Sequence, residues 1–331
     1  MPYLPGLDGM RALAVVAVMI FHANHAWMPA GFLGVEVFFV ISGYLITLLL
    51  IAEDERDGGV SLRAFWGRRF RRLLPALYLT LIGLVIYCAL FMREQLGHLR
   101  GDVVAAVFYV SNWFQIWVGQ GYGSLTAFVP LRHLWSLAVE EQFYLVWPLV
   151  MVWLLRKGRE RLPQVGLQLI AAAFVIAAVT SILFHKGVVS GVESTPDAYW
   201  SLFGRDIDTN NALYLSTITR ASGILLGAGF AMLWRPVAMM RGPMRTKGRQ
   251  LDLIAAVALV LLVGQMLTYE LIGERTARYF PPLFNGGLLL TGVLTVVLIA
   301  AVTHSETLIS KLLGHPVLNW IGTRSYGLYL F

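Results

Sequence analysis

The stretch RALAVVAVMIFH joins two ionisable side chains, Arg11 and His22, through ten residues that carry no other titratable group. On an α-helix, eleven residues correspond to a rise of about 16 Å and a rotation of three turns plus about 20°. Arg11 and His22 therefore lie on one face, near opposite ends of one helix. Taken alone, His22 could be an interfacial residue and Arg11 an orientation signal, but ionisable groups within apolar helices are costly and tend to be functional.

Two further stretches place charges beside apolar segments. In GFLGVEVFFVISGYLIT, Glu36 is expected in the outer turns of the second span, where a carboxylate could orient His22 or hold its proton. It could equally be a surface charge. In FWGRRFRRLLPALYL, four arginines precede Pro75, which suits the first turn of a helix. These arginines (68, 69, 71 and 72) predict either membrane-surface anchors or a phosphate-binding cluster, because guanidinium forks match phosphate oxygens.

The stretch HLWSLAVEEQFYLVWP places Ser136 and Glu140 four residues apart, on one helix face. Packing alone does not account for the acidic pair Glu140–Glu141, which we expect at the outer end of an apolar helix. In TITRASGILLGAGFA, Arg220 lies within a span and needs a partner or water. Its neighbours Gly223 and Gly227 have the spacing of a close helix contact.

The composition is that of a membrane protein. The 331 residues are 57% hydrophobic and only 14% charged, against about 25% charged in soluble proteins. Apolar runs of about 20 residues, enough to cross a bilayer, recur along the chain. We expect an all-α, polytopic transmembrane bundle of about 9–10 spans. The candidate segments are 11–29, 34–52, 73–92, 102–118, 134–155, 167–184, 211–234, 251–272 and 283–303, with a last run from Arg324.

The loop charges predict a re-entrant segment at 102–118. If all nine segments crossed, the basic loops 156–163 and 235–250 would lie outside, against the positive-inside tendency. If 102–118 enters and leaves on one face, 18 of the 26 Lys and Arg lie in cytoplasmic loops and seven outside, with a cytoplasmic N-terminus. Asn112 and Gln115 suit a segment that lines a cavity. A full crossing with weak charge signals is the alternative.

Together, these motifs and the closing IGTRSYGLYL resemble the membrane-bound acyltransferase 3 family, in order and over nearly the whole chain. By position, the family's Arg-x10-His pair falls on Arg11 and His22, and its Arg-x-x-Arg on Arg69 and Arg72. The family's acidic residue in the second span is usually Asp, whereas this chain has Glu36. We expect one membrane acyltransferase domain over 1–331, cut within its last helix, without a soluble domain.

The resemblance implies an O-acyltransferase that moves an acyl group, often acetyl, from cytoplasmic acyl-CoA to a saccharide hydroxyl. The donor is a substrate, so no bound cofactor and no metal are expected. We assign Arg11, Arg69 and Arg72 to the coenzyme A phosphates. The expected catalytic residues are His22, Glu36, Glu140 and Glu141, and the expected substrate-binding residues are Trp135, Ser136 and Arg220. His22 would deprotonate the acceptor, or carry the acyl group covalently.

The expected partners are acyl-CoA, a saccharide or lipid-linked glycan on the cell surface, and the bilayer of a bacterial inner membrane. The net charge of +7 is explained by cytoplasmic loops, so nucleic acid is not expected. A small metabolite such as a macrolide is an alternative acceptor, and a transporter is an alternative class. His98 and Asp102 have the His-xxx-Asp spacing of soluble acyltransferases, but they fall in an outer loop and are the weaker candidates.

Overall fold

The protein is a bundle of membrane-length helices. The computed structural model describes residues 3–331 except 122–128, 237–245, 274–277 and 305. Eight helical segments in this described part are long and apolar enough to cross a membrane. They are built on α1 (Pro5–Ala23), α2 (Gly34–Asp57), α3 (Leu62–Phe91), α6 (Leu134–Arg156), α7 (Leu162–Leu183), α9 (Thr217–Leu233), α11 (Gly248–Thr268) and α12 (Leu288–Val302).

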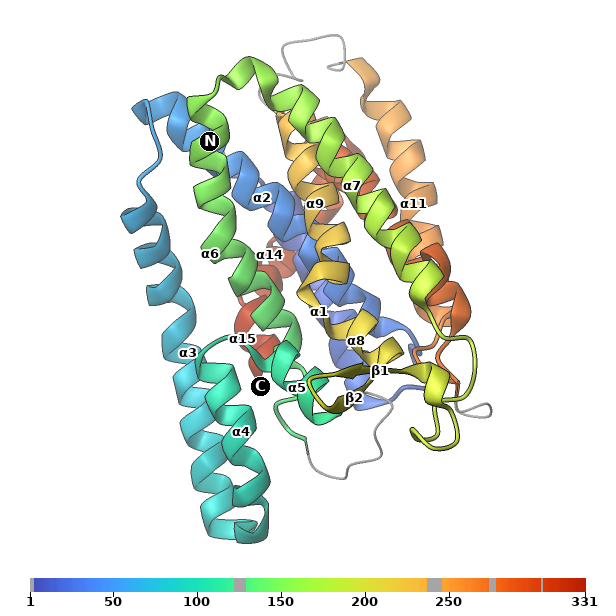
Figure 1. Cartoon of the computed structure of the whole chain (residues 1–331). Helices are drawn as coiled ribbons and strands as arrows, with labels where there is room; N and C mark the ends of the chain where they lie inside the picture. The colour runs from blue at the N-terminus through green and yellow to red at the C-terminus, as the bar shows by residue number, and fades with distance from the viewer. Residues whose placement is uncertain (1–2, 122–128, 237–245, 274–277, 305) are drawn as a thin grey trace.

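Shorter elements connect these helices. They are the helices α4 (Leu96–Val107), α5 (Ser111–Val118), α8 (Thr209–Leu215), α13 (Leu308–Leu313), α14 (Pro316–Thr323) and α15 (Ser325–Leu330). An antiparallel hairpin of β1 (Tyr199–Leu202) and β2 (Arg205–Asp208) lies beside α8 (Figure 1). Single turns are η1 (Gly31–Leu33), η2 (Arg93–Gln95), η3 (Arg159–Arg161), η4 (Pro196–Ala198) and the π-helical η6 (Leu283–Gly287).

Local sequence signals set several helix ends. Pro5 begins α1, where its missing N–H costs no helical hydrogen bond. α2 stops at Gly58, which adopts the left-handed conformation with φ of 73°. The Ser61 hydroxyl accepts a hydrogen bond from the Ala64 N–H at the start of α3, and Ser216 caps α9 in the same way. These signals fix where the spans that carry the site residues begin and end.

The centre of the bundle is the contact between α2 and α9. A Cβ on Gly227 would meet the Val40 carbonyl oxygen, and one on Gly43 would meet the carbonyl oxygen of Ile224. Both backbones can approach this closely because glycine has no side chain. The expected small-residue helix contact is therefore confirmed, and it holds α9 against the helix that carries Glu36.

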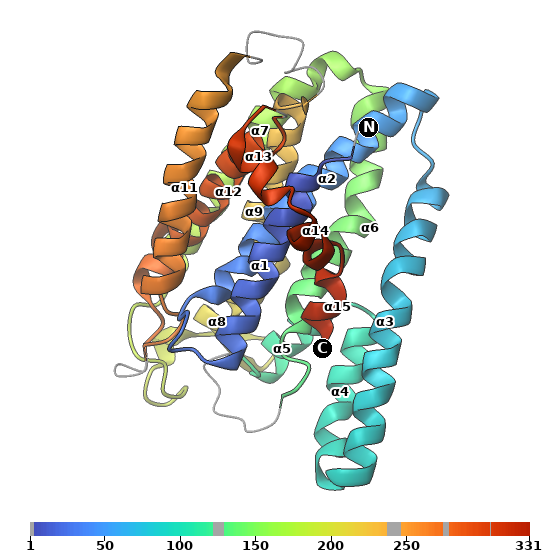
Figure 2. The same ribbon diagram turned by 180° about the vertical axis from the view of Figure 1, so that it is seen from behind.

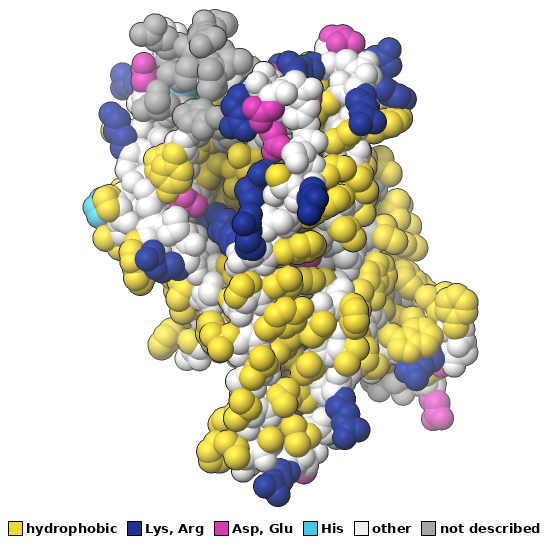
Figure 3. Space-filling view, turned by 90° about the vertical axis from the view of Figure 1, so that its left-hand side faces the viewer, with side chains coloured by type: hydrophobic (Ala, Val, Ile, Leu, Met, Phe, Trp, Pro, Cys, Tyr) yellow, Lys and Arg dark blue, Asp and Glu magenta, His cyan; other side chains and the backbone are white. Residues whose placement is uncertain are grey.

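The outer helices present apolar side chains to the surroundings. On α3, Leu79, Ile82 and Leu90 are largely exposed, as are Ile182 on α7 and Val260 on α11. Figure 3 shows hydrophobic side chains as a broad yellow surface on the α3 side of the molecule. Such a surface suits lipid rather than water.

The candidate segment 102–118, the fourth of the nine, does not form a spanning helix. It is divided into α4 and α5 by a break at Tyr109, whose φ is +53°. The Asn112 amide donates to the Leu215 carbonyl and the Thr217 hydroxyl, and the Gln115 amide donates to the Arg132 carbonyl. These buried amides stabilise non-helical backbone inside protein, as the re-entrant interpretation requires. Figure 1 shows α4 and α5 in the lower half of the bundle, where α3 ends and α6 begins.

The described helices therefore include eight of spanning length rather than nine or ten. The other difference lies at the last run, where residues 316–330 form the two short helices α14 and α15. With 102–118 returning to its own side, the α2–α3 and α6–α7 connections and the start of α11 lie at one end of the bundle (Figures 1 and 2). We call this end, which carries the basic loops, the basic end.

Candidate active site

Arg11 and His22 lie on one unbroken helix, as the spacing predicts. Arg11 is half-buried and forms a 3.9 Å ion pair with Asp8. His22 is in the last turn of α1, at the end of the bundle away from the basic loops, and is exposed. Its Nδ1 lies 2.8 Å from the Val18 carbonyl oxygen. Because a carbonyl only accepts, Nδ1 carries the hydrogen in this contact, so the Nε2 of a neutral ring holds a free lone pair.

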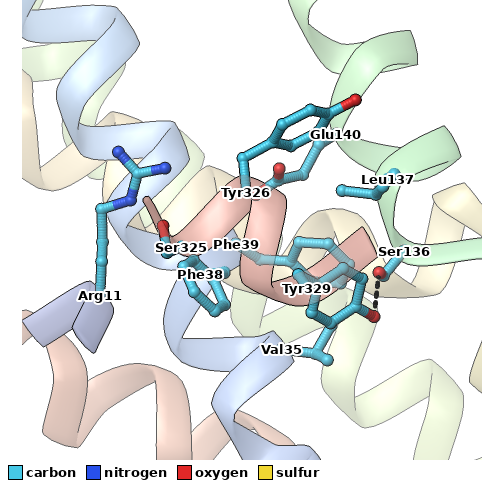
Figure 4. A pocket seen from close by; sticks show the side chains of 10 residues that line it. All are labelled: Arg11, Val35, Phe38, Phe39, Ser136, Leu137, Glu140, Ser325, Tyr326 and Tyr329. Atoms are coloured by element: carbon cyan, nitrogen blue, oxygen red, sulfur yellow. Dashed lines mark hydrogen bonds between the residues drawn. The ribbon is translucent and has the colours of Figure 1, made fainter. Parts of the chain in front are cut away.

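A small pocket of about 40 Å³ lies between α1, α2, α6 and α15. Arg11 lies on one side of it, and the Ser136 and Tyr329 hydroxyls face it from the other side, 2.7 Å apart (Figure 4). Glu140 and Tyr326 also line it. The pocket therefore brings together residues from two separate motifs: Arg11 from the first, and Ser136 and Glu140 from the stretch HLWSLAVEEQFYLVWP.

Glu140 belongs to this inner polar cluster and does not stand at an outer helix end. Its carboxylate accepts a 2.6 Å hydrogen bond from Ser42, whose hydroxyl accepts one from Tyr144. The Arg69 guanidinium lies over the Tyr144 ring at 4.2 Å. Arg11, Arg69 and Arg72 are close enough to act electrostatically on Glu140, and Arg69 acts on Glu141 in the same way. The expected outer position of the acidic pair is not observed, because α6 turns these residues toward the arginines of α3.

Arg68, Arg69 and Arg72 of α3 line a cleft of about 400 Å³ between α2 and α3, toward the basic end. We call it the arginine cleft. Arg68 is paired with Glu53 at 3.1 Å, whereas Arg69 and Arg72 form no ion pair with any described residue. Arg72 is also near enough to Arg11 and Arg69 for their charges to repel. Figure 3 shows Lys and Arg side chains gathered in the upper half of the α3 side. Cations gathered in this way favour a polyanionic ligand.

Glu36 does not contact His22. It is 1% exposed, and its Oε2 lies 2.9 Å from Nη2 of Arg220, which is 2% exposed. The Arg220 guanidinium lies 5.1–5.5 Å from the ring centroids of Phe39, Trp135 and Tyr214. The ion pair is enclosed by these aromatic rings. The extra methylene of Glu36 thus serves a contact with α9, and the sequence-based roles for Glu36 beside His22 and for Arg220 at the substrate have no contact here to support them.

Trp135 also faces this aromatic cluster. Its ring is 1% exposed and packs on Phe39 and Tyr214 with centroids 6.1 and 5.2 Å apart. It is not among the residues that line the pocket, although its neighbour Ser136 is. Successive helix positions point about 100° apart, so Ser136 and Trp135 serve different surroundings.

His133, which the sequence analysis did not single out, directly precedes α6, and its backbone carbonyl accepts hydrogen bonds from the pocket-lining Ser136 and Tyr329 hydroxyls. Burial lowers the pKa of its ring to about 4, and the nearby charge of His22 adds to the effect. The Tyr329 hydroxyl donates to the His133 backbone carbonyl at 3.1 Å. His133 is therefore neutral near pH 7, and its backbone holds the hydroxyl pair in place.

Other site residues were also missed in the sequence. Tyr326 and Tyr329 come from the closing SYGLYL, and Ser42 and Tyr144 from stretches already quoted for other residues. Hydroxyl groups near carboxylates in apolar helices are the signal that could have found them. The weaker pair, His98 and Asp102, lies on α4, and neither residue lines the pocket or the arginine cleft.

The comparisons with known proteins identify the family of the chain. An acyltransferase-domain family, Acyl_transf_3, matches residues 4–331. The peptidoglycan O-acetyltransferase OatA of Listeria monocytogenes is 37% identical over 330 residues, which are 99% of this chain and 49% of the relative. The putative peptidoglycan O-acetyltransferase YrhL of Bacillus subtilis is 38% identical over 335 residues, covering 99% of this chain and 48% of the relative.

A putative O-acetyltransferase of Staphylococcus aureus (strain COL) is 37% identical over the whole chain and half its own length. The chain thus spans about half the length of these curated relatives. No solved structure matches it. Because the family match runs from residue 4 to residue 331 and the sequence motifs agree with it, the chain belongs to the acyltransferase 3 family of acyl-transferring membrane enzymes.

Proposed function

We propose that the chain moves an acetyl group from acyl-CoA at its basic end to a hydroxyl of a cell-wall saccharide, with peptidoglycan as the first candidate. The observation that best supports this is the series of polar groups along the bundle. It begins at Arg69 and Arg72 and continues through Arg11 and the Ser136–Tyr329 pair, and His22 lies in the last turn of α1, toward the opposite end of the bundle. By the positive-inside tendency, the basic end faces the cytoplasm of a bacterial cell membrane.

The donor site would hold the coenzyme A phosphates in the arginine cleft. Arg69, Arg72 and Arg11 repel one another when the cleft is empty of anions, so a polyanion relieves a cost already present in the fold. Guanidinium groups bind phosphate oxygens through paired hydrogen bonds. The pantetheine arm would then run through the pocket beside Ser136 and Tyr329 toward His22.

The reaction needs a base at the end of that arm. In this proposal, His22 Nε2 accepts the proton of the acceptor hydroxyl while the oxygen of that hydroxyl attacks the thioester carbonyl carbon. The carbon–sulfur bond breaks, the sulfur leaves with the bonding electrons, and the proton on His22 goes to the thiolate to give free coenzyme A. An acyl-His22 intermediate would use the same residues in two steps.

The acceptor would enter from the other end of the bundle. A cleft of about 340 Å³ there is lined by His25, Glu270 and Phe21, among others. The Phe21 ring contacts both His22 and His25, with centroids 5.2 and 4.4 Å apart. Imidazole and carboxylate groups above an aromatic ring suit sugar hydroxyls. Two of the relatives are named as peptidoglycan O-acetyltransferases, which supports a saccharide acceptor.

Labelled acetyl-CoA supplied to inside-out membrane vesicles tests this proposal. We expect thiol release together with label on peptidoglycan fragments. Thiol release that requires an added small metabolite such as a macrolide would support the alternative acceptor. No thiol release with any acceptor would contradict the enzyme assignment and favour transport.

A further inference from the structure

A cleft between α6 and α7, away from the catalytic residues, has the features of a lipid site. It measures about 390 Å³ and is lined by residues at the end of α6 and the start of α7. Figure 1 shows this α6–α7 connection at the basic end. Apolar side chains of both helices form its wall, including Val150 and Leu169. Lys157 and Arg161 stand at the level where a membrane helix leaves the hydrocarbon region. This cleft does not share a residue with the pocket or the arginine cleft.

The two cations of the cleft are available to an anion. In the same connection, Arg159 is held by Asp54 at 2.7 Å. Lys157 and Arg161 form no ion pair with a described residue, and both are exposed. The Lys157 ammonium lies 3.7 Å from the centroid of the Trp153 ring, which holds the charge at the edge of the cleft. Asp54 of α2 thus neutralises Arg159, while Lys157 and Arg161 line the cleft without an ion pair to a described residue, including Glu160 of the same connection.

Polar residues of α7 continue the same edge. Gln164 and Gln168 are one turn apart, exposed, and line the cleft, although the rest of α7 is strongly apolar. Uncharged amides at this depth can bond a glycerol hydroxyl or a phosphate ester. Together with the apolar wall, the two cations and two amides match an amphipathic ligand that carries one negative charge.

We propose that the α6–α7 cleft binds one anionic phospholipid of the leaflet at the basic end. Its phosphate would lie between Lys157 and Arg161, its glycerol headgroup against Gln164 and Gln168, and an acyl chain along the apolar wall. Basic pockets between transmembrane helices are suited to such headgroups. A soluble phosphate would leave the apolar wall uncovered, so the lipid is the better match. The proposal does not depend on the donor or acceptor of the transfer reaction.

Native mass spectrometry of the purified full chain tests the site with dioleoylphosphatidylglycerol and dioleoylphosphatidylcholine as probes. We expect the protein to bind dioleoylphosphatidylglycerol at least ten-fold more tightly than dioleoylphosphatidylcholine. A basic side chain near a membrane surface contributes about five-fold to the affinity for an anionic lipid, so Lys157→Ala/Arg161→Ala should weaken it about 25-fold. Arg63→Ala/Arg156→Ala removes the same charge from exposed residues outside the cleft, so it should change the affinity for dioleoylphosphatidylglycerol less than two-fold.

Equal losses in the two double variants would show a general charge effect and overturn the proposal, as would equal binding of the two lipids by the unaltered protein. Displacement of the lipid by free glycerol 3-phosphate at similar concentrations would overturn the role of the apolar wall. Hydrogen exchange of the unaltered protein in nanodiscs avoids any folding defect of the variants. We expect the phosphatidylglycerol discs to slow exchange at residues 157–165 relative to phosphatidylcholine discs, and no difference there would contradict the site.

Discussion

Arg220 and Glu36 form a 2.9 Å ion pair between α9 and α2, with side chains only 2% and 1% exposed. The pair lies about one turn from the close backbone approach at Gly227, and a Cβ on Gly223 would meet the Glu36 carboxylate. A charge that loses its partner in such a place is left without water. This relationship assigns both residues to holding α2 against α9, and so to positioning Phe39 of α2 beside the pocket.

Removing one member of this pair should destabilise the fold strongly. We expect Glu36→Gln or Arg220→Met to cost about 3–5 kcal/mol, because each leaves one buried charge unpaired. The double variant should cost clearly less than the sum of the two single costs. Thermal unfolding of the four proteins in one detergent measures this coupling. Costs that simply add would contradict a direct interaction between the two side chains.

Arg69→Ala/Arg72→Ala should weaken acyl-CoA binding by about 100-fold or more, because the double variant removes two charge-assisted contacts that contribute about 1.5–3 kcal/mol each. Lysine at these positions should restore only part of the affinity, because it lacks the guanidinium fork. Calorimetric titration with coenzyme A gives the dissociation constants. Arg71→Ala is the matched control, since Arg71 is exposed, bonds the Gly67 carbonyl and does not line the cleft. A comparable loss in this control would contradict a specific donor site.

His25→Ala/Glu270→Gln should raise the KM for the saccharide acceptor about ten-fold and leave coenzyme A affinity unchanged, because the cleft that they line is at the opposite end from the arginines. Steady-state rates at several concentrations of peptidoglycan fragments measure the change. Glu193→Gln, in an exposed loop and outside this cleft, serves as the control. An unchanged KM in the cleft variant would move the acceptor site elsewhere.

The stability of the protein should depend on His133 below pH 6.5. Burial lowers the pKa of its ring from 6.5 to about 4, so the unfolded chain binds the proton more readily than the folded one. The stabilisation is complete above pH 6.5 and is lost as the pH falls toward 4. We expect His133→Asn to flatten this part of the curve of melting temperature against pH. Burial also raises the pKa of Asp102 to about 6, which makes stability fall as the pH rises in the same range. The quantity to compare is therefore the difference in melting temperature between wild type and His133→Asn at each pH.

The sequence predicted those features that depend on helical periodicity within one segment or on the charges of the loops. The shared face of Arg11 and His22 follows from the helical repeat within one segment, and the re-entrant segment follows from loop charges together with Asn112 and Gln115. The partner of Glu36 could not be predicted, because hydropathy gives the depth of a residue in the membrane but not the helix that faces it. Tyr329 was missed for the same reason, since only the packing of α15 against α6 brings its hydroxyl to Ser136.

The account depends most on His22 as the group that acts on the acceptor. The direct measurement is the transfer of labelled acetyl from acetyl-CoA to peptidoglycan fragments by wild type, His22→Ala and His98→Ala, with coenzyme A binding measured on each. His98 is an exposed histidine on α4 and serves as the matched control. We predict a loss of 10²- to 10⁴-fold in transfer for His22→Ala with coenzyme A binding retained, and no loss for His98→Ala. Normal transfer by His22→Ala would contradict the account, and loss in His98→Ala alone would place the base on α4.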